Sequence, residues 1–66
     1  MSERRVIFYD LTVPIAQIRE NDDKPDQVPD IVWRNYVRER ENDEGYCVLG
    51  GKLYTWFKER TPIEEQ

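Results

Sequence analysis

The chain has 66 residues, one cysteine and no histidine, and its formal net charge is −4. A chain of this length forms one domain that buries only about 60% of its unfolded surface, so its core is small. A single cysteine excludes an internal disulfide and the lack of histidine leaves no soft ligand set for zinc, so oligomerisation or a partner chain is the remaining source of extra stability.

The first expected element is a strand over residues 4–10. Val6, Ile7, Phe8 and Tyr9 form an uninterrupted run of residues that favour strands. Such a run is typical of a strand covered on both faces. We expect it to be the central strand of a small sheet.

The segment that follows, up to Glu20, has two interpretations. Pro14 is acceptable in the first turn of a short helix that would run through Ile15 and Ile18. An extended segment fits the same residues almost equally well, so both alternatives stay open.

An acidic loop is expected over residues 21–29, which are rich in Asp, Asn and Pro. Residues 20–30 carry a charge of −4, from one lysine and five acidic residues, whereas residues 31–60 carry +1. The acid either keeps a mobile loop solvated or meets a basic partner, with Asp22, Asp23 and Asp26 as the contact. Because the spacing lacks the glycine and the terminal glutamate of a calcium loop, no metal is expected there.

The main helix is expected from Ile31 to about Asn42. Asp30 follows Pro29 and can cap the first turn. An apolar stripe at helical spacing then predicts a helix laid on a sheet, with Gly45 just past its end. The stripe consists of Val32, Trp33, Tyr36, Val37 and Arg40.

A β-hairpin is expected around Gly50-Gly51, which suit a two-residue turn with both residues at positive φ. The implied register pairs Leu49 with Lys52 and places Trp56 across from Gly45, where the ring would cover bare backbone. Alternation then separates two faces. The face assigned to packing under the helix carries Tyr46, Val48, Leu53, Thr55 and Phe57, and the second face carries Cys47, Leu49, Lys52, Tyr54, Trp56 and Lys58.

These elements predict an α+β domain with a three-stranded antiparallel-type sheet on one main helix, possibly with one further short helix. Residues 1–66 form this single domain, and residues 61–66 are expected to be a flexible tail. One helix covers one side of the sheet only. The second face is therefore exposed, buried by residues 11–19, or buried in a homodimer.

Two binding functions follow from that second face. As a protein-binding site, Tyr54 and Trp56 would anchor a partner and Lys52 and Lys58 would form its polar rim. As an alternative, single-stranded nucleic acid would stack its bases on the two rings while the lysines follow the phosphates. The acidic total charge and the lack of a continuous basic stripe favour a protein partner.

An enzyme is not expected. Acid–base chemistry at neutral pH usually needs a histidine or carboxylates held in an apolar pocket, and this chain is too short to enclose one. Cys47 lies in mid-strand, where a cysteine usually packs as a small apolar group. We therefore predict no catalytic residue and no cofactor. With no apolar run of about 18 residues and no secretory leader, we expect a cytoplasmic protein.

In general style, a compact acidic domain that is rich in aromatic residues and has no catalytic apparatus resembles the small accessory proteins with which bacteriophages bind and redirect host proteins. No particular residue carries this resemblance. It implies a regulator or inhibitor that occupies a surface on a host protein.

Overall fold

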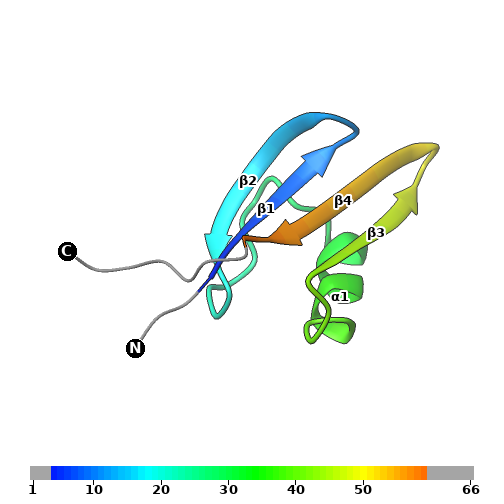
Figure 1. Cartoon of the computed structure of the whole chain (residues 1–66). Coiled ribbons are helices and arrows are strands. Elements are labelled where there is room, and N and C mark those ends of the chain that lie inside the picture. The colour runs from blue at the N-terminus through cyan, green and yellow to red at the C-terminus, as the bar shows by residue number, and fades with distance from the viewer. Residues whose placement is uncertain (1–3, 60–66) are drawn as a thin grey trace.

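The computed structural model describes residues 4–59, which form four antiparallel strands and one helix (Figure 1). The elements are β1 (Arg5–Asp10), β2 (Val13–Arg19), α1 (Asp30–Arg38), β3 (Glu44–Leu49) and β4 (Lys52–Lys58). The strand order is β2-β1-β4-β3. The α+β class is confirmed, but the sheet has four strands where the sequence predicted three.

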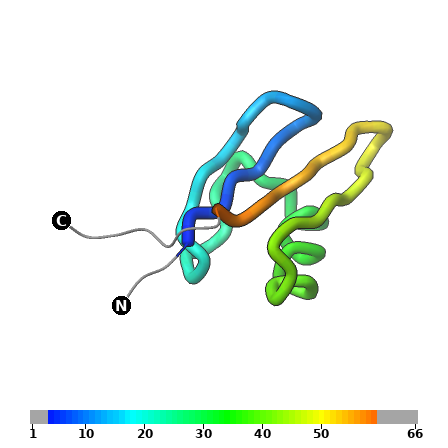
Figure 2. The backbone as a smooth tube through the Cα atoms, viewed as in Figure 1, coloured from blue at the N-terminus to red at the C-terminus, as the bar shows by residue number. Residues whose placement is uncertain are grey.

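The two central strands come from opposite ends of the described chain. β1 pairs with β4 in the register Val6↔Lys58 to Asp10↔Tyr54, which confirms the central place predicted for the first strand. The tube in Figure 2 shows the two hairpins side by side, with β1 and β4 between the edge strands.

The fourth strand is the segment for which a short helix was one alternative. Residues 13–19 are extended and pair with β1, so the helical interpretation of residues 14–20 is wrong. The turn before β2 contains Leu11 at a φ of 58°, a left-handed conformation that non-glycine residues adopt infrequently. Because this turn contains no glycine, the sequence does not indicate a hairpin here.

The β3–β4 hairpin agrees with its prediction. Every predicted pair is present, from Leu49↔Lys52 to Gly45↔Trp56. Gly50 and Gly51 have φ values of 58° and 79°, as a two-residue turn of the predicted kind requires.

The helix is shorter than expected, because α1 ends at Arg38 and Glu39 is its C-cap residue. Its N-cap residue is Pro29, with no side-chain cap hydrogen bond, so the capping role predicted for Asp30 is wrong. Gly45 does not end the helix but lies within β3. Of the predicted apolar stripe, Val32 and Tyr36 are buried, whereas Val37 is exposed.

The core lies on one side of the sheet, between the strands and α1. It includes Val28 from the acidic loop, which lies on the same side as the helix. The buried apolar residues are Val6, Phe8, Ile18, Val28, Val32, Tyr36, Cys47 and Trp56. The predicted assignment of the hairpin faces is therefore inverted: the Cys47 and Trp56 face packs under the helix, and the Tyr46 and Phe57 face does not.

The loop of residues 21–29 contains no helix or strand, as predicted. It is nevertheless attached to the core. Val28 is fully buried, and Lys24 Nζ donates to the Val28 carbonyl at 2.9 Å. The mobility expected for this loop stays a prediction, and the expected tail of residues 61–66 lies outside the described residues.

Candidate interaction surface

The seven residues predicted to bind a partner do not form one surface. Trp56 and Lys58 are buried, with exposed fractions of 1% and 6%. Tyr54 is half-buried and Lys52 is exposed. The acidic residues Asp22, Asp23 and Asp26 are all exposed in the loop after β2. Their role in binding stays a prediction, but Trp56 and Lys58 are out of reach unless the helix separates from the sheet.

Trp56 is held inside by its neighbours on three elements. Its ring lies 6.0 Å from that of Phe8 on β1 and 6.1 Å from that of Tyr36 on α1, centroid to centroid. A Cβ built on Gly45 of β3 would lie only 2.6 Å from Trp56 Cζ2. The predicted contact of Trp56 with Gly45 is therefore confirmed, and it belongs to the core.

Lys58 reaches two acceptors inside the domain. Its ammonium lies 3.3 Å from Glu20 Oε2 and donates a hydrogen bond to the Arg40 carbonyl. Glu20 Oε1 also accepts from the Arg4 backbone N–H at 3.0 Å. This backbone hydrogen bond, together with Lys58, lowers the pKa of Glu20 below its ordinary value of 4.5, against the opposing effect of burial. Lys58 is thus a structural cation that ties β4 to the end of β2 and to the chain after α1.

The opposite side of the sheet carries no helix or loop from the described residues. It presents apolar and aromatic side chains from three strands. Tyr46 is 68% exposed and Val48 is 64% exposed, while Leu53 and Phe57 are each 36% exposed. We call this surface the outer face, and it consists of Ile7, Tyr9, Tyr46, Val48, Leu53, Thr55 and Phe57.

Two aromatic rings of the outer face stack on each other across β1 and β4. The Tyr9 and Phe57 rings stack with their centroids 5.7 Å apart and an interplanar angle of 14°. Thr55 lies between Tyr9 and Tyr46 in the sheet register. Rings that already stack on each other lose less conformational entropy when a partner covers them.

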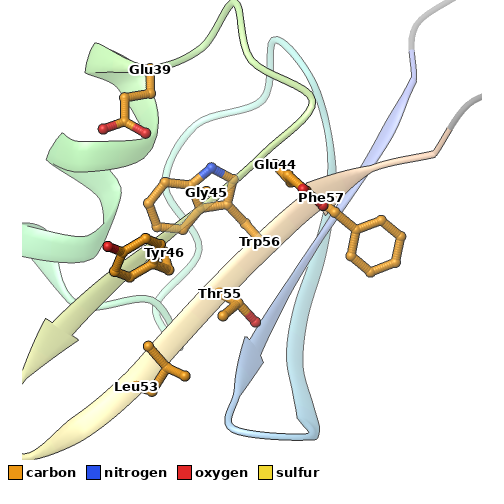
Figure 3. Close-up of a pocket in the computed structure, with 8 residues that line it drawn as sticks. All are labelled: Glu39, Glu44, Gly45, Tyr46, Leu53, Thr55, Trp56 and Phe57. Atoms are coloured by element: carbon orange, nitrogen blue, oxygen red, sulfur yellow. The ribbon is translucent and has the colours of Figure 1, made fainter.

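A pocket of ≈ 720 Å³ opens on β3 and β4 (Figure 3). Its walls carry aromatic side chains, and its charged residues are both carboxylates. It is lined by Glu39, Glu44, Gly45, Tyr46, Leu53, Thr55, Trp56 and Phe57. In Figure 3 the Glu39 carboxylate points toward the side where the Tyr46 and Trp56 rings lie, and the Glu44 carboxylate lies near Phe57.

Cys47 has the structural role that its strand position indicated. Its side chain is buried and its sulfur accepts from Asn35 Nδ2 of α1 at 3.4 Å. No group of three or more potential metal ligands is present within residues 4–59. In the same range, no helix is long and apolar enough to cross a membrane.

Sequence reasoning missed the outer face because alternation defines two faces without saying which one is covered. Residue type distinguishes the two faces. Cysteine and tryptophan are buried more often, on average, than tyrosine or threonine, and the two former residues mark the covered face here. The lysines suggested the wrong exposed face, because Lys58 has its partners inside the domain.

Comparison with known proteins adds no relative, since the chain matches no family model and resembles no curated protein or solved structure.

Proposed function

We propose that this protein is a non-enzymatic, cytoplasmic protein-binding module that acts by occupying a surface on another protein. The uncovered outer face carries the proposal. The accessory or inhibitor role that the small acidic chain resembles belongs to the same proposal, with a host protein as the partner.

The argument rests on exposed apolar surface. Single exposed apolar residues are common on soluble proteins, but contiguous patches usually mark an interaction site. Here Tyr46, Val48, Leu53 and Phe57 are neighbours on two paired strands and are all exposed. Tyrosine and phenylalanine are also enriched at protein interfaces. A protein partner that covers these side chains removes them from water.

A homodimer is the form of this proposal in which the partner is a second copy. The small core favours it, as the sequence predicted. The Tyr54 and Trp56 face is covered by α1, so the outer face is the surface that remains for such a dimer. Sedimentation over a concentration series tests this form, and Val48→Ser should shift a dimer toward monomer.

The nucleic-acid alternative loses its main support. It needed two exposed rings flanked by two exposed lysines, and Trp56 and Lys58 are both buried. The pair Tyr46 and Phe57 offers stacking surface, but the charged residues of the neighbouring pocket are Glu39 and Glu44, which repel phosphates.

The test compares two faces of the same protein by capture from the native host. The outer-face variant is Tyr46→Ser/Val48→Ser, and the matched control is Arg34→Ser/Arg38→Ser on the exposed side of α1. We expect wild type and the helix control to retain one specific protein that the outer-face variant loses. Circular dichroism should show that all three proteins are folded.

The result that contradicts the proposal is equally specific. If the outer-face variant retains every protein that wild type retains, the outer face is not the binding surface. If purified wild type and the purified candidate show no association in a direct titration, the captured protein is not a partner.

A further inference from the structure

β3 is an open edge of the sheet. In an antiparallel pair, residues alternate between those bonded to the neighbouring strand and those whose N–H and C=O point away. Counted from the two-residue turn, Leu49, Cys47 and Gly45 bond to β4, so the peptide groups of Glu44, Tyr46 and Val48 point outward. None of the turn, loop and cap backbone hydrogen bonds within residues 4–59 uses these three residues.

The two edges of the sheet are protected differently. β2 contains Pro14, which has no N–H to offer, and its register with β1 is irregular next to Phe8 and Tyr9. Both features discourage the addition of another strand. β3 has neither a proline nor an irregularity within its six residues. Strand addition is therefore favoured at β3.

The carboxylates beside β3 favour a cationic side chain on the partner. Glu39 and Glu44 line the pocket at this edge, and neither forms an ion pair with another described residue. Glu39 is also the C-cap residue of α1, where the helix dipole is negative and adds to the attraction for a cation. The rings of Tyr46 and Phe57 provide faces on which a guanidinium can stack.

The inner wall of the pocket is formed by the buried indole of Trp56. Trp56 lines the pocket and is 1% exposed, and its Nε1–H has no hydrogen-bond partner among the described residues. The ring packs directly against the backbone of β3 at Gly45, where a Cβ would lie only 2.9 Å from Nε1. This donor is enclosed within the domain, so the selectivity of the pocket comes from its carboxylates and exposed rings.

We propose that the partner contributes an extended segment that adds to the sheet along β3, with an arginine or lysine side chain bound between Glu39 and Glu44. Main-chain hydrogen bonds to Glu44, Tyr46 and Val48 provide affinity, and the acidic, aromatic pocket provides selectivity. This inference rests on the proposed function and names the partner chemistry. A second copy is the less suitable occupant of this edge, because it would bring its own Glu39 and Glu44 to the same place.

The test uses the full-length, isotope-labelled protein and a defined peptide, acetyl-Arg-Thr-Val-Thr-Val-Thr-Arg-amide. An arginine at each end places a cation near Glu44 in either strand direction. The control peptide has glutamate in place of both arginines. We expect the arginine peptide to shift the amide signals of Glu44, Tyr46 and Val48 in nuclear magnetic resonance spectra, and to leave those of β2 unchanged.

Three variants separate the parts of the inference. Glu39→Gln/Glu44→Gln should weaken binding of the arginine peptide about tenfold, as expected for the loss of two favourable charge contacts. Asp22→Asn/Asp23→Asn removes the same charge from the acidic loop and should change affinity less than about twofold. Val48→Pro removes an outward N–H and should abolish the shifts along β3.

The inference is overturned if the arginine peptide causes no shifts at millimolar concentration, binds no better than the glutamate peptide, or binds equally to Glu39→Gln/Glu44→Gln. Shifts confined to residues of β1 and β4, with the amide signals of Glu44, Tyr46 and Val48 unchanged, also overturn it. A protein that ignores the peptide but loses a host protein through Tyr46→Ser/Val48→Ser keeps the proposed function and loses only this inference.

Discussion

The two faces of one sheet differ in what covers them far more than in what they are made of. The covered face carries Trp56 and Cys47 under α1, and it also carries a lysine, Lys58. The outer face carries the exposed rings of Tyr46 and Phe57, and strand alternation places Glu44 beside them on the same side of the sheet. A count of apolar residues therefore does not identify the core of this domain. Burial follows from where the single helix and the loop before it pack.

The largest expected difference in stability is between Trp56→Ala and Phe57→Ala, which change adjacent residues on opposite faces of the sheet. Trp56→Ala should cost about 3–5 kcal/mol, because a fully buried ring leaves a cavity. That loss approaches the whole stability of a domain this small, about 3–10 kcal/mol. Phe57→Ala should cost about 1 kcal/mol, from its stacking on Tyr9.

Urea unfolding followed by circular dichroism measures both losses without using tryptophan fluorescence. Equal losses for the two variants would contradict the assignment of the faces, since Phe57 would then be buried as deeply as Trp56.

A second pair compares the two lysines that alternation places on the same face. Lys58→Met should cost about 2–3 kcal/mol, because the Arg40 carbonyl loses its donor and Glu20 keeps only Arg4 nearby. Lys52 is exposed and its ammonium lies 4.0 Å from Asp10, so Lys52→Met should change stability by less than about 0.5 kcal/mol. Urea midpoints at low and high salt separate the two, since only the effect of Lys52 should vanish at high salt. A loss for Lys58→Met as small as that for Lys52→Met would mean that Lys58 is solvated.

Gly45→Ala tests how closely Trp56 packs under β3. The added methyl would lie 2.6 Å from Trp56 Cζ2, so we expect a loss of about 1–3 kcal/mol from overpacking. Replacement of the indole by a smaller ring in Gly45→Ala/Trp56→Phe should relieve this contact, so the double variant should lose less than the sum of the two single losses. Additive losses in thermal unfolding would show that the two residues do not press on each other.

The smallest expected effect is the pH dependence from Glu20. Its pKa is lowered in the folded protein, so its contribution to stability is present above its ordinary value of 4.5 and is lost as the pH falls through the lowered value. Wild type should therefore lose more stability between pH 6 and pH 3 than Glu20→Gln does. Unfolding curves at several pH values measure this difference. Parallel pH profiles for the two proteins would remove Glu20 from the interactions that hold Lys58.

Local patterns predicted the parts of the fold that depend on neighbours in sequence. Gly50-Gly51 determined the register of β3 and β4 correctly, because glycines at positive φ suit one kind of turn. The apolar run at Val6 identified a central strand. The first hairpin could not be predicted because its turn contains Leu11 at a positive φ. Leucine gives no indication of that conformation.

The site was predicted less well because it depends on long-range packing. The faces of the hairpin were separated correctly, and only the placement of α1 decides which of them is covered. Lys58 looked like a surface residue because its partners, Glu20 and Arg40, lie 38 and 18 positions earlier in the chain. No local pattern connects residues so far apart.

The order of strands also has a consequence for how this protein reaches its native state. β1 and β4 are neighbours in the sheet, although they are the first and last strands of the described chain. Closing so long a loop costs conformational entropy before the contacts between β1 and β4 contribute any stabilisation. Topologies of this kind fold slowly. A growing chain that has reached β3 still lacks the strand that joins its two halves. The domain should therefore acquire its structure only after β4 has been synthesised and in a single step, with no stable fragment before that point.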